Sequence, residues 1–120
     1  MKNGTLVLGA SLNPGTYSNL AIKRLRAKDI VVIAIGKQKG FVEDVEIEIE
    51  KKLFKNVDTV TLYLNPKRQK EYYSYVLALK PRRVIFNPGT ENNVFVELLE
   101  KNKIGTEIAC TLVLLSINQY

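Results

Sequence analysis

A loop of small and turn-forming residues carries the clearest chemistry in this sequence of 120 residues. The run Gly9-Ala10-Ser11-Leu12-Asn13-Pro14-Gly15 directly follows the apolar segment Thr5–Leu8. A glycine after a strand permits a tight turn, and the small side chains of Ala10 and Ser11 let a phosphate approach main-chain N–H groups. The Ser11 hydroxyl adds another donor. The pattern predicts a nucleotide-phosphate site, and a plain turn without a ligand is the alternative.

A second loop, Gly36-Lys37-Gln38-Lys39, follows the next apolar segment. The dinucleotide fingerprint has an acidic residue at this point, which holds the ribose hydroxyls. This loop has no acid, and the first loop reads Gly9-x-Ser11-x-x-Pro14 instead of Gly-x-Gly-x-x-Gly. Lysines at positions 37 and 39 suit a phosphate on or near the ribose, so the two loops together predict a phosphate-rich ligand.

Positive charge gathers around these loops. The chain has 18 Lys and Arg against 12 Asp and Glu, which gives a net charge of +6. Residues 1–41 contain seven of the basic side chains and only one acidic side chain. An anionic ligand is therefore drawn to the N-terminal third. A solvated basic helix face is the alternative for residues 23–28.

The composition excludes several kinds of chemistry. The chain has no histidine, which removes His-based acid–base catalysis, Ser-His and Cys-His nucleophiles and the usual zinc ligand sets. Its one cysteine, Cys110, is expected to act as a small buried hydrophobe facing the mouth of the cleft. Asp58 and Glu91 are isolated carboxylates, whereas general acid–base work needs two groups around one substrate. We therefore expect no catalytic and no metal-binding residues.

The remaining composition places the chain in a broad class. No segment reaches the roughly 18 apolar residues of a membrane span, and the N-terminus lacks the apolar core of a signal peptide. We expect one cytoplasmic domain over residues 1–120, with neither a membrane nor a nucleic acid as partner. Tyr72, Tyr73 and Tyr75 lie near basic residues, but Tyr72 and Tyr75 fall on an apolar helix stripe, which favours core packing over base stacking.

The first half of the chain reads as strand, loop, helix and strand. The helix has apolar residues at Ala21, Ile22 and Leu25, with Ser18 as its expected cap, and the apolar run Ile30–Ile35 is typical of a buried parallel strand. Val45, Ile47 and Ile49 alternate with glutamates, which predicts a half-exposed edge strand. Residues 51–54 could continue that strand or form a helical turn.

The second half repeats the alternation. Its expected strands are Thr59–Leu64, Arg83–Phe86 and Thr106–Cys110. Asn65 and Pro66 predict the start of a helix that ends before Pro81, and Thr90 or Asn92 can cap a helix that stops at Gly105. An apolar tail, Thr111–Tyr120, must pack on the body.

Alternating strands and helices predict an α/β protein. We expect a three-layer, Rossmann-like, doubly wound parallel sheet of about five strands with helices on both faces. Ligands of such sheets bind beyond the carboxyl ends of the strands, where the strand order reverses. Most of the glycine and proline of this chain falls in the loops at that end.

Several of these segments, in this order, resemble the CoA-binding domain family, small stand-alone Rossmann-like proteins related to the CoA-binding part of succinyl-CoA synthetase. The matching segments are Val7–Pro14, Ile30–Ile35, Val57–Val60, Asn87–Asn92 and a late Cys110. The resemblance implies binding of CoA or an acyl-CoA. It places around the pyrophosphate Gly9, Ala10, Ser11, Asn13 and Pro14. Near the adenosine end, the resemblance implies Gly36 and Lys37, with Asn65 and Pro66 beside them. On the far side of the cleft, it implies Pro88, Gly89 and Asn92.

The sequence departs from the family pattern at three places. It has Gly15-Thr16-Tyr17 where the family usually has a basic residue, Gly36-Lys37 in place of Asn-Pro, and Ala109 in place of arginine. Lys37 or Lys39 could compensate for the missing basic residue. The first hypothesis is thus a CoA- or acyl-CoA-binding module without catalysis.

Two other hypotheses stay open. One is an NAD(P)-binding oxidoreductase-like protein, with NADP as a less favoured ligand than CoA. The other is a degenerate interaction module without a ligand. A homodimer is conceivable through the apolar tail or through an exposed edge at Val45–Ile49.

Overall fold

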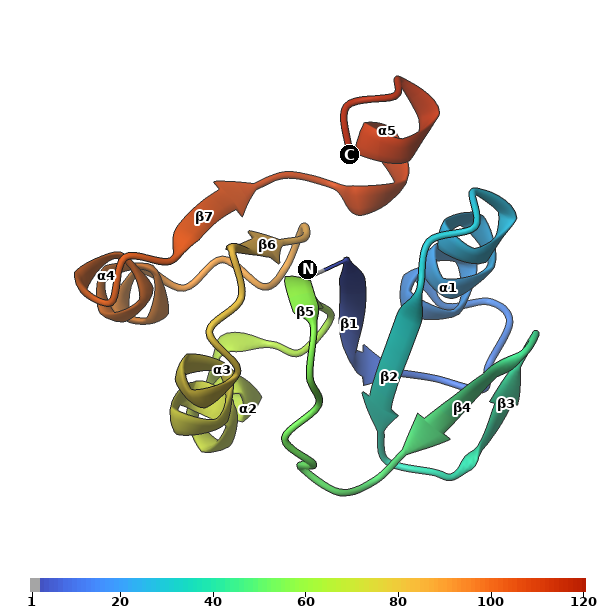
Figure 1. Cartoon of the computed structure of the whole chain (residues 1–120), viewed down its shortest axis with the longest axis horizontal. Helices are drawn as coiled ribbons and strands as arrows, with labels where there is room; N and C mark the ends of the chain where they lie inside the picture. The colour runs from blue at the N-terminus through green and yellow to red at the C-terminus, as the bar shows by residue number, and fades with distance from the viewer. Residues whose placement is uncertain (1–2) are drawn as a thin grey trace.

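A computed structural model of the chain, which describes residues 3–120, contains one sheet with the strand order β3-β4-β2-β1-β5-β6-β7 (Figure 1). The strands are β1 (Gly4–Ala10), β2 (Val32–Gly36), β3 (Gly40–Val42), β4 (Val45–Glu48), β5 (Val57–Leu62), β6 (Arg83–Phe86) and β7 (Gly105–Ile108). Neighbouring strands pair in parallel, except that β3 is antiparallel to β4. The predicted fold class is confirmed, with seven strands in the sheet where about five were expected.

Helices cover both faces of this sheet. One face packs against α1 (Tyr17–Ala27) and α5 (Thr111–Ser116), the other against α3 (Tyr73–Leu79) and α4 (Asn93–Lys101). The short helix α2 (Pro66–Gln69) and the 3₁₀ turn η1 (Lys70–Tyr72) lead into α3. Figure 1 shows α1 and α5 near each other, and α2, α3 and α4 grouped away from them.

The central strand shows how the two faces are divided. Leu6 and Leu8 of β1 are fully buried in the core beneath α3 and α4, whereas Val7 between them is buried in the core beneath α1 and α5. Side chains alternate between the faces of a strand, so a continuous apolar run fills both cores at once. This is why the short apolar segments of the sequence form buried strands.

The chain changes direction at β1. It passes from β1 to β2 on one side and later returns to β5, which pairs with β1 on the other side. The loops that leave β1 and its two neighbours therefore diverge at the carboxyl end of the sheet, and a crevice opens there.

The region after β2 differs from the expectation. Val45–Glu48 forms β4, but β4 is an inner strand because the three-residue strand β3 covers its outer side. The prediction of an edge at Val45–Ile49 is therefore wrong, because the edge is β3, whereas the predicted alternation is confirmed: Val45 and Ile47 are buried and Glu46 is exposed. The turn joining the two strands has Glu43 in the left-handed region, with φ of 54°. Residues 51–54 form no helix.

Three helix boundaries also differ. Thr16, not Ser18, caps α1, and its side chain accepts a hydrogen bond from the Asn19 N–H. The expected continuous helix up to Pro81 is interrupted by the 3₁₀ turn η1. The helix before Gly105 is α4, which ends at Lys101 with Asn102 as its C-terminal cap, and Gly105 is the first residue of β7. The Asn65 cap is confirmed, and of the two predicted alternatives, Thr90 and Asn92, it is Asn92 that caps α4.

The packing at Gly36 provides a test of this fold. A Cβ atom there would lie 2.2 Å from the Ala10 carbonyl oxygen. We expect Gly36→Ala to lower the free energy of unfolding by about 1–3 kcal/mol or more, because backbone in a packed sheet cannot move away cheaply. Urea unfolding measures this. The control is Gly15→Ala, whose Cβ would meet only the Asn13 side chain at 3.3 Å. Equal stability of the two variants would contradict the close approach at Gly36.

Candidate functional site

Two adjoining hollows lie at the carboxyl ends of the central strands, with volumes of about 530 and 510 Å³. Both are lined by Gly9, Ser11, Tyr63, Leu64 and Arg68. The first hollow extends toward the end of β2, and the second toward the start of α1 and the loop after β6. Together they form one cleft, which crosses the point where the strand order reverses.

The loop after β1 forms the floor between the two hollows. Gly9 has a φ of +98°, and a Cβ at this position would lie 3.0 Å from the Tyr63 backbone. The Ser11 hydroxyl accepts a hydrogen bond from the Asn13 N–H at 3.0 Å, and the Asn13 side chain accepts one from the Gly15 N–H at 2.9 Å. These bonds hold the loop in a compact turn that leads into α1.

The start of α1 faces the second hollow. Tyr17 and Ser18 line this hollow, and N–H groups in the first turn of a helix have no intrahelical acceptor. The buried Asn19 side chain donates to the Ser11 carbonyl oxygen at 3.0 Å, which ties the helix to the loop. The first turn contains no acidic residue. This end of the helix therefore offers donors and a favourable dipole to an anion.

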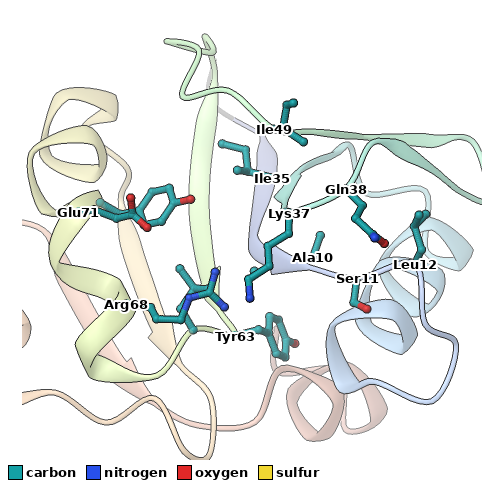
Figure 2. Close-up of a pocket in the computed structure, with 14 residues that line it drawn as sticks. Ala10, Ser11, Leu12, Ile35, Lys37, Gln38, Ile49, Tyr63, Arg68 and Glu71 are labelled. Atoms are coloured by element: carbon teal, nitrogen blue, oxygen red, sulfur yellow. The ribbon is translucent and has the colours of Figure 1, made fainter.

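Two cations face each other across the first hollow. Figure 2 shows Lys37, from the end of β2, and Arg68, from α2, with their charged groups pointing toward each other. Among residues 3–120 neither side chain forms an ion pair or a hydrogen bond. Like charges repel at short range, so this arrangement favours an anion between them.

The N-terminal cap of α2 positions Arg68. The Asn65 side chain accepts a hydrogen bond from the Arg68 N–H at 2.9 Å, and Pro66 occupies the first helical position. The next residue, Gln69, is fully buried and donates to the carbonyl oxygens of Leu64 and Thr90, both at 2.8 Å. This wall of the cleft is therefore fixed from beneath by a buried amide.

Asn87 fixes the wall of the second hollow. Its amide donates to the Thr61 hydroxyl at 2.7 Å and to the Leu62 carbonyl oxygen at 2.9 Å, and its oxygen accepts from the Thr111 N–H at 2.9 Å. One side chain thereby joins β5, β6 and α5. The Pro88-Gly89 turn that lines the hollow starts from this residue.

Tyr63 lines both hollows on the α1–α5 side of the sheet. Its hydroxyl is buried and makes no hydrogen bond of good geometry among the described residues. Burial raises the pKa of this phenol, and the nearby hydroxyls of Thr61 and Thr111 partly oppose the shift. Tyr63 therefore stays protonated at neutral pH and is a neutral part of the floor.

The structure brings most of the sequence-predicted site residues to the cleft. The first hollow is lined by Gly9, Ala10, Ser11, Gly36 and Lys37. The second is lined by Gly9 and Ser11 as well, together with Asn65, Pro88 and Gly89. The others do not line it. Asn13 and Pro14 lie in the loop beyond the floor, and Pro66 starts α2. Lys39 does not line the cleft, and its charge helps to lower the pKa of Glu48 in β4.

Asn92, predicted to line the cleft, is buried behind its wall. Its oxygen caps α4 by accepting from the Phe95 N–H, and its amide donates to the Gln69 oxygen and the Tyr73 hydroxyl, both at 2.9 Å. The residue was thus rightly predicted as a cap, and its hydrogen bonds support the cleft wall from behind.

Several residues that line the cleft were not predicted from the sequence. Arg68 comes from α2, Glu71 and Tyr72 come from η1, and Tyr63 directly follows β5. The signal for Arg68 was available, because a basic residue in the first turn after Asn65-Pro66 stands at the carboxyl end of a strand. Tyr72 was assigned to the core, but it is only partly buried and also lines the cleft. Tyr75 is a core residue as expected.

Cys110 and Asp58 lie away from the cleft, whereas the Glu91 carboxylate accepts a hydrogen bond at 2.7 Å from the N–H of Gly89, which lines the second hollow. Cys110 precedes α5 as its cap residue, is partly buried and lines neither hollow, so the expectation that it faces the cleft mouth is wrong. Asp58 pairs with Arg82 at 2.9 Å at the amino end of β5, and this guanidinium holds the pKa of the carboxyl below its usual value. In residues 3–120 no group of three or more His, Cys, Asp or Glu side chains could hold a metal ion. None of the helices there is long and apolar enough to cross a membrane.

The fold and the position of the cleft define a Rossmann-like α/β protein. Residues 4–116 match the protein family described as "CoA binding domain". The chain therefore belongs to the CoA-binding domain family, as the motifs of the sequence suggested. A comparison with curated proteins gives no match.

Solved structures repeat the whole fold. A crystal structure described as that of an "uncharacterized protein" has 45% sequence identity and a TM-score of 0.95, covering 100% of this chain and 99% of its own. A conserved hypothetical protein from Pyrococcus furiosus has 25% identity and a TM-score of 0.75, covering 89% of this chain and 92% of its own. The Thermus thermophilus protein "cell-free ID.343" has 21% identity and a TM-score of 0.87, covering 99% and 91%, and shows the likeness of fold.

The buried position of Asn92 leads to a prediction. Asn92→Ala removes the cap of α4 and leaves the Gln69 oxygen buried without its donor. We expect the free energy of unfolding to fall by about 2–3 kcal/mol, as measured by urea unfolding. Asn93→Ala, at an exposed neighbouring position, is the control and should change stability by less than about 0.5 kcal/mol. Similar stability of both variants would show that Asn92 does not support the wall.

Proposed function

We propose that the chain binds CoA or an acyl-CoA in the cleft and catalyses no reaction itself. The observation that carries the proposal is the pair of unpaired cations, Lys37 and Arg68, which face each other beside the Gly9–Ser11 floor. A pyrophosphate between them would neutralise both charges and accept charge-assisted hydrogen bonds. Membership of the CoA-binding domain family supports the choice of ligand.

The three parts of the cleft correspond to the three parts of CoA. Its first end is apolar, with Ile35, Ile49 and Tyr72, and suits a planar base. The middle contains Lys37 and Arg68, and suits the pyrophosphate. The second hollow has polar linings that include Thr16, Ser18 and Thr90, and suits the amide-rich pantetheine arm. Asn65 also lines this hollow, which differs from the resemblance, where it lies beside the adenosine end.

The start of α1 extends the phosphate site from the other side. The first-turn N–H groups of Tyr17 and Ser18 face the second hollow, across from Arg68, which lines both hollows. This supplies donors where the family usually has a basic residue after Asn-Pro. In this chain Arg68 and Lys37 together take over the role of that residue.

The lining groups support binding over catalysis. Glu71 is the one carboxylate among the described residues that line the cleft, so no pair of carboxylates surrounds a substrate there. Burial raises the pKa of the phenols of Tyr63 and Tyr72, which keeps both protonated. An NADP-dependent oxidoreductase would share the phosphate contacts, so the ligand must be identified by comparison.

A ligand panel tests the proposal. Thermal unfolding is followed with CoA, acetyl-CoA, NAD, NADP and ATP, each near 1 mM. A ligand that binds only the native state raises the melting temperature, so we expect a rise with CoA and acetyl-CoA that exceeds any rise with the others. A rise confined to NAD or NADP would favour an oxidoreductase-like protein, and no rise with any ligand would favour an interaction module. Either result contradicts the proposal.

The two cations can be tested separately. We expect Arg68→Ala and Lys37→Ala each to weaken CoA binding on the order of tenfold, because each loses a charge-assisted hydrogen bond worth about 1.5–3 kcal/mol. Isothermal titration calorimetry measures this, and higher salt should weaken wild-type binding. Lys67→Ala, beside Arg68 but exposed outside the cleft, is the control.

The same titration distinguishes the two lysines that the sequence pointed to. Since Lys37 lines the cleft and Lys39 does not, Lys39→Ala should bind CoA nearly as the wild type does. A loss with Lys39→Ala but none with Lys37→Ala would contradict the geometry of the site.

A further inference from the structure

Glu71 introduces a single negative charge into a cleft that otherwise carries cations. Glu71 belongs to η1 and lines the first hollow, on the side opposite Ile35 and Ile49 (Figure 2). The side chain is 59% exposed. An acid beside a phosphate site opposes the binding of the phosphates themselves, so its position at the apolar end calls for a different partner.

The surroundings of Glu71 form a slot for a flat, apolar group. Ile35, Ile49 and Tyr72 line this end of the first hollow. The Tyr72 ring is partly buried, and its pKa is raised by burial and by the charge of Glu71, while Arg68 opposes the shift. Tyr72 thus lines the same hollow as Glu71 and Arg68 and is affected by the charges of both.

Lys51 is hydrogen-bonded to the backbone of Glu71 and not to its carboxylate. The Lys51 amine donates to the Glu71 backbone carbonyl oxygen at 2.7 Å and lies 4.7 Å from the centre of the Tyr72 ring. It also forms an ion pair with the Glu71 carboxylate at 3.8 Å, a distance too long for a hydrogen bond. The backbone is thus anchored, while the carboxylate retains its capacity to accept hydrogen bonds.

We propose that Glu71 is a specificity-determining residue that reads the exocyclic amine of the base in this slot. An ionised carboxylate only accepts hydrogen bonds, so it favours a base that presents an N–H₂ group, as adenine does. It disfavours a base with a carbonyl oxygen at the same place, because two acceptors would face each other. This inference rests on the proposed function, since it assumes that the base end of the ligand occupies the slot.

The test compares CoA with its hypoxanthine counterpart, in which a carbonyl oxygen replaces the amine and all phosphates are unchanged. Isothermal titration calorimetry gives both dissociation constants. We expect the wild type to prefer CoA on the order of tenfold, as for one hydrogen bond to a charged group. Glu71→Gln should bring this ratio close to one, because an amide can rotate to donate to the carbonyl oxygen or accept from the amine.

The matched control is Glu97→Gln, which makes the same change of charge at an exposed position outside the cleft and should retain the wild-type ratio. Circular dichroism confirms that both variants fold. Equal binding of the two ligands by the wild type, or an unchanged ratio in Glu71→Gln, would overturn the role of Glu71 while CoA binding itself stands. If the wild type bound neither ligand, the proposed function would fail and this inference with it.

Discussion

The cleft depends on the close approach of main chains where β1 ends. The backbone that leaves β1 passes against the end of β2 at Gly36, where a Cβ would lie 2.2 Å from the Ala10 oxygen, and against β5 at Gly9, where φ is +98°. Only glycine fits both conditions at low cost. The two glycines let neighbouring main chains approach each other closely, and Ser11 and Lys37, which come soon after them in the sequence, line the first hollow.

Much of the fold could be predicted from local patterns. Uninterrupted apolar runs identified the inner strands, and Asn65-Pro66 and Asn92 identified helix starts, because these signals depend on neighbouring residues only. The strand β4 was predicted, but β3 was missed, since it is three residues long and its turn uses Glu43 in a left-handed conformation that the sequence does not mark. Thr16 and Ser18 are both suitable caps, and the turn held by Asn13 decided for Thr16, whose N–H and hydroxyl both donate to the Asn13 carbonyl oxygen.

The loops of the site could be predicted from the sequence, but the wall opposite them, formed by α2 and η1, could not. Gly9, Ser11, Gly36 and Lys37 follow strands directly, so topology alone brings them together. The opposing wall comes from α2 and η1, and the sequence did not predict that η1 interrupts the helix between α2 and α3. Tyr72 was assigned to the core from a helical stripe, and it does pack against the core while it also lines the cleft. Asn92 was predicted at the cleft, yet its buried bonds to Gln69 and Tyr73 place it behind the wall.

Mapping of CoA onto the backbone amides tests the central claim most directly. In a ¹⁵N-labelled sample titrated with CoA, the account predicts the largest amide shifts at residues 9–12, at Tyr17 and Ser18, and at Lys37 and Arg68. Amides at the opposite end of the sheet, such as those of Asp58 and Arg82, should stay in place. Shifts confined to that opposite end, or no shifts at saturating CoA, would contradict a CoA site at the carboxyl ends of β1, β2 and β5.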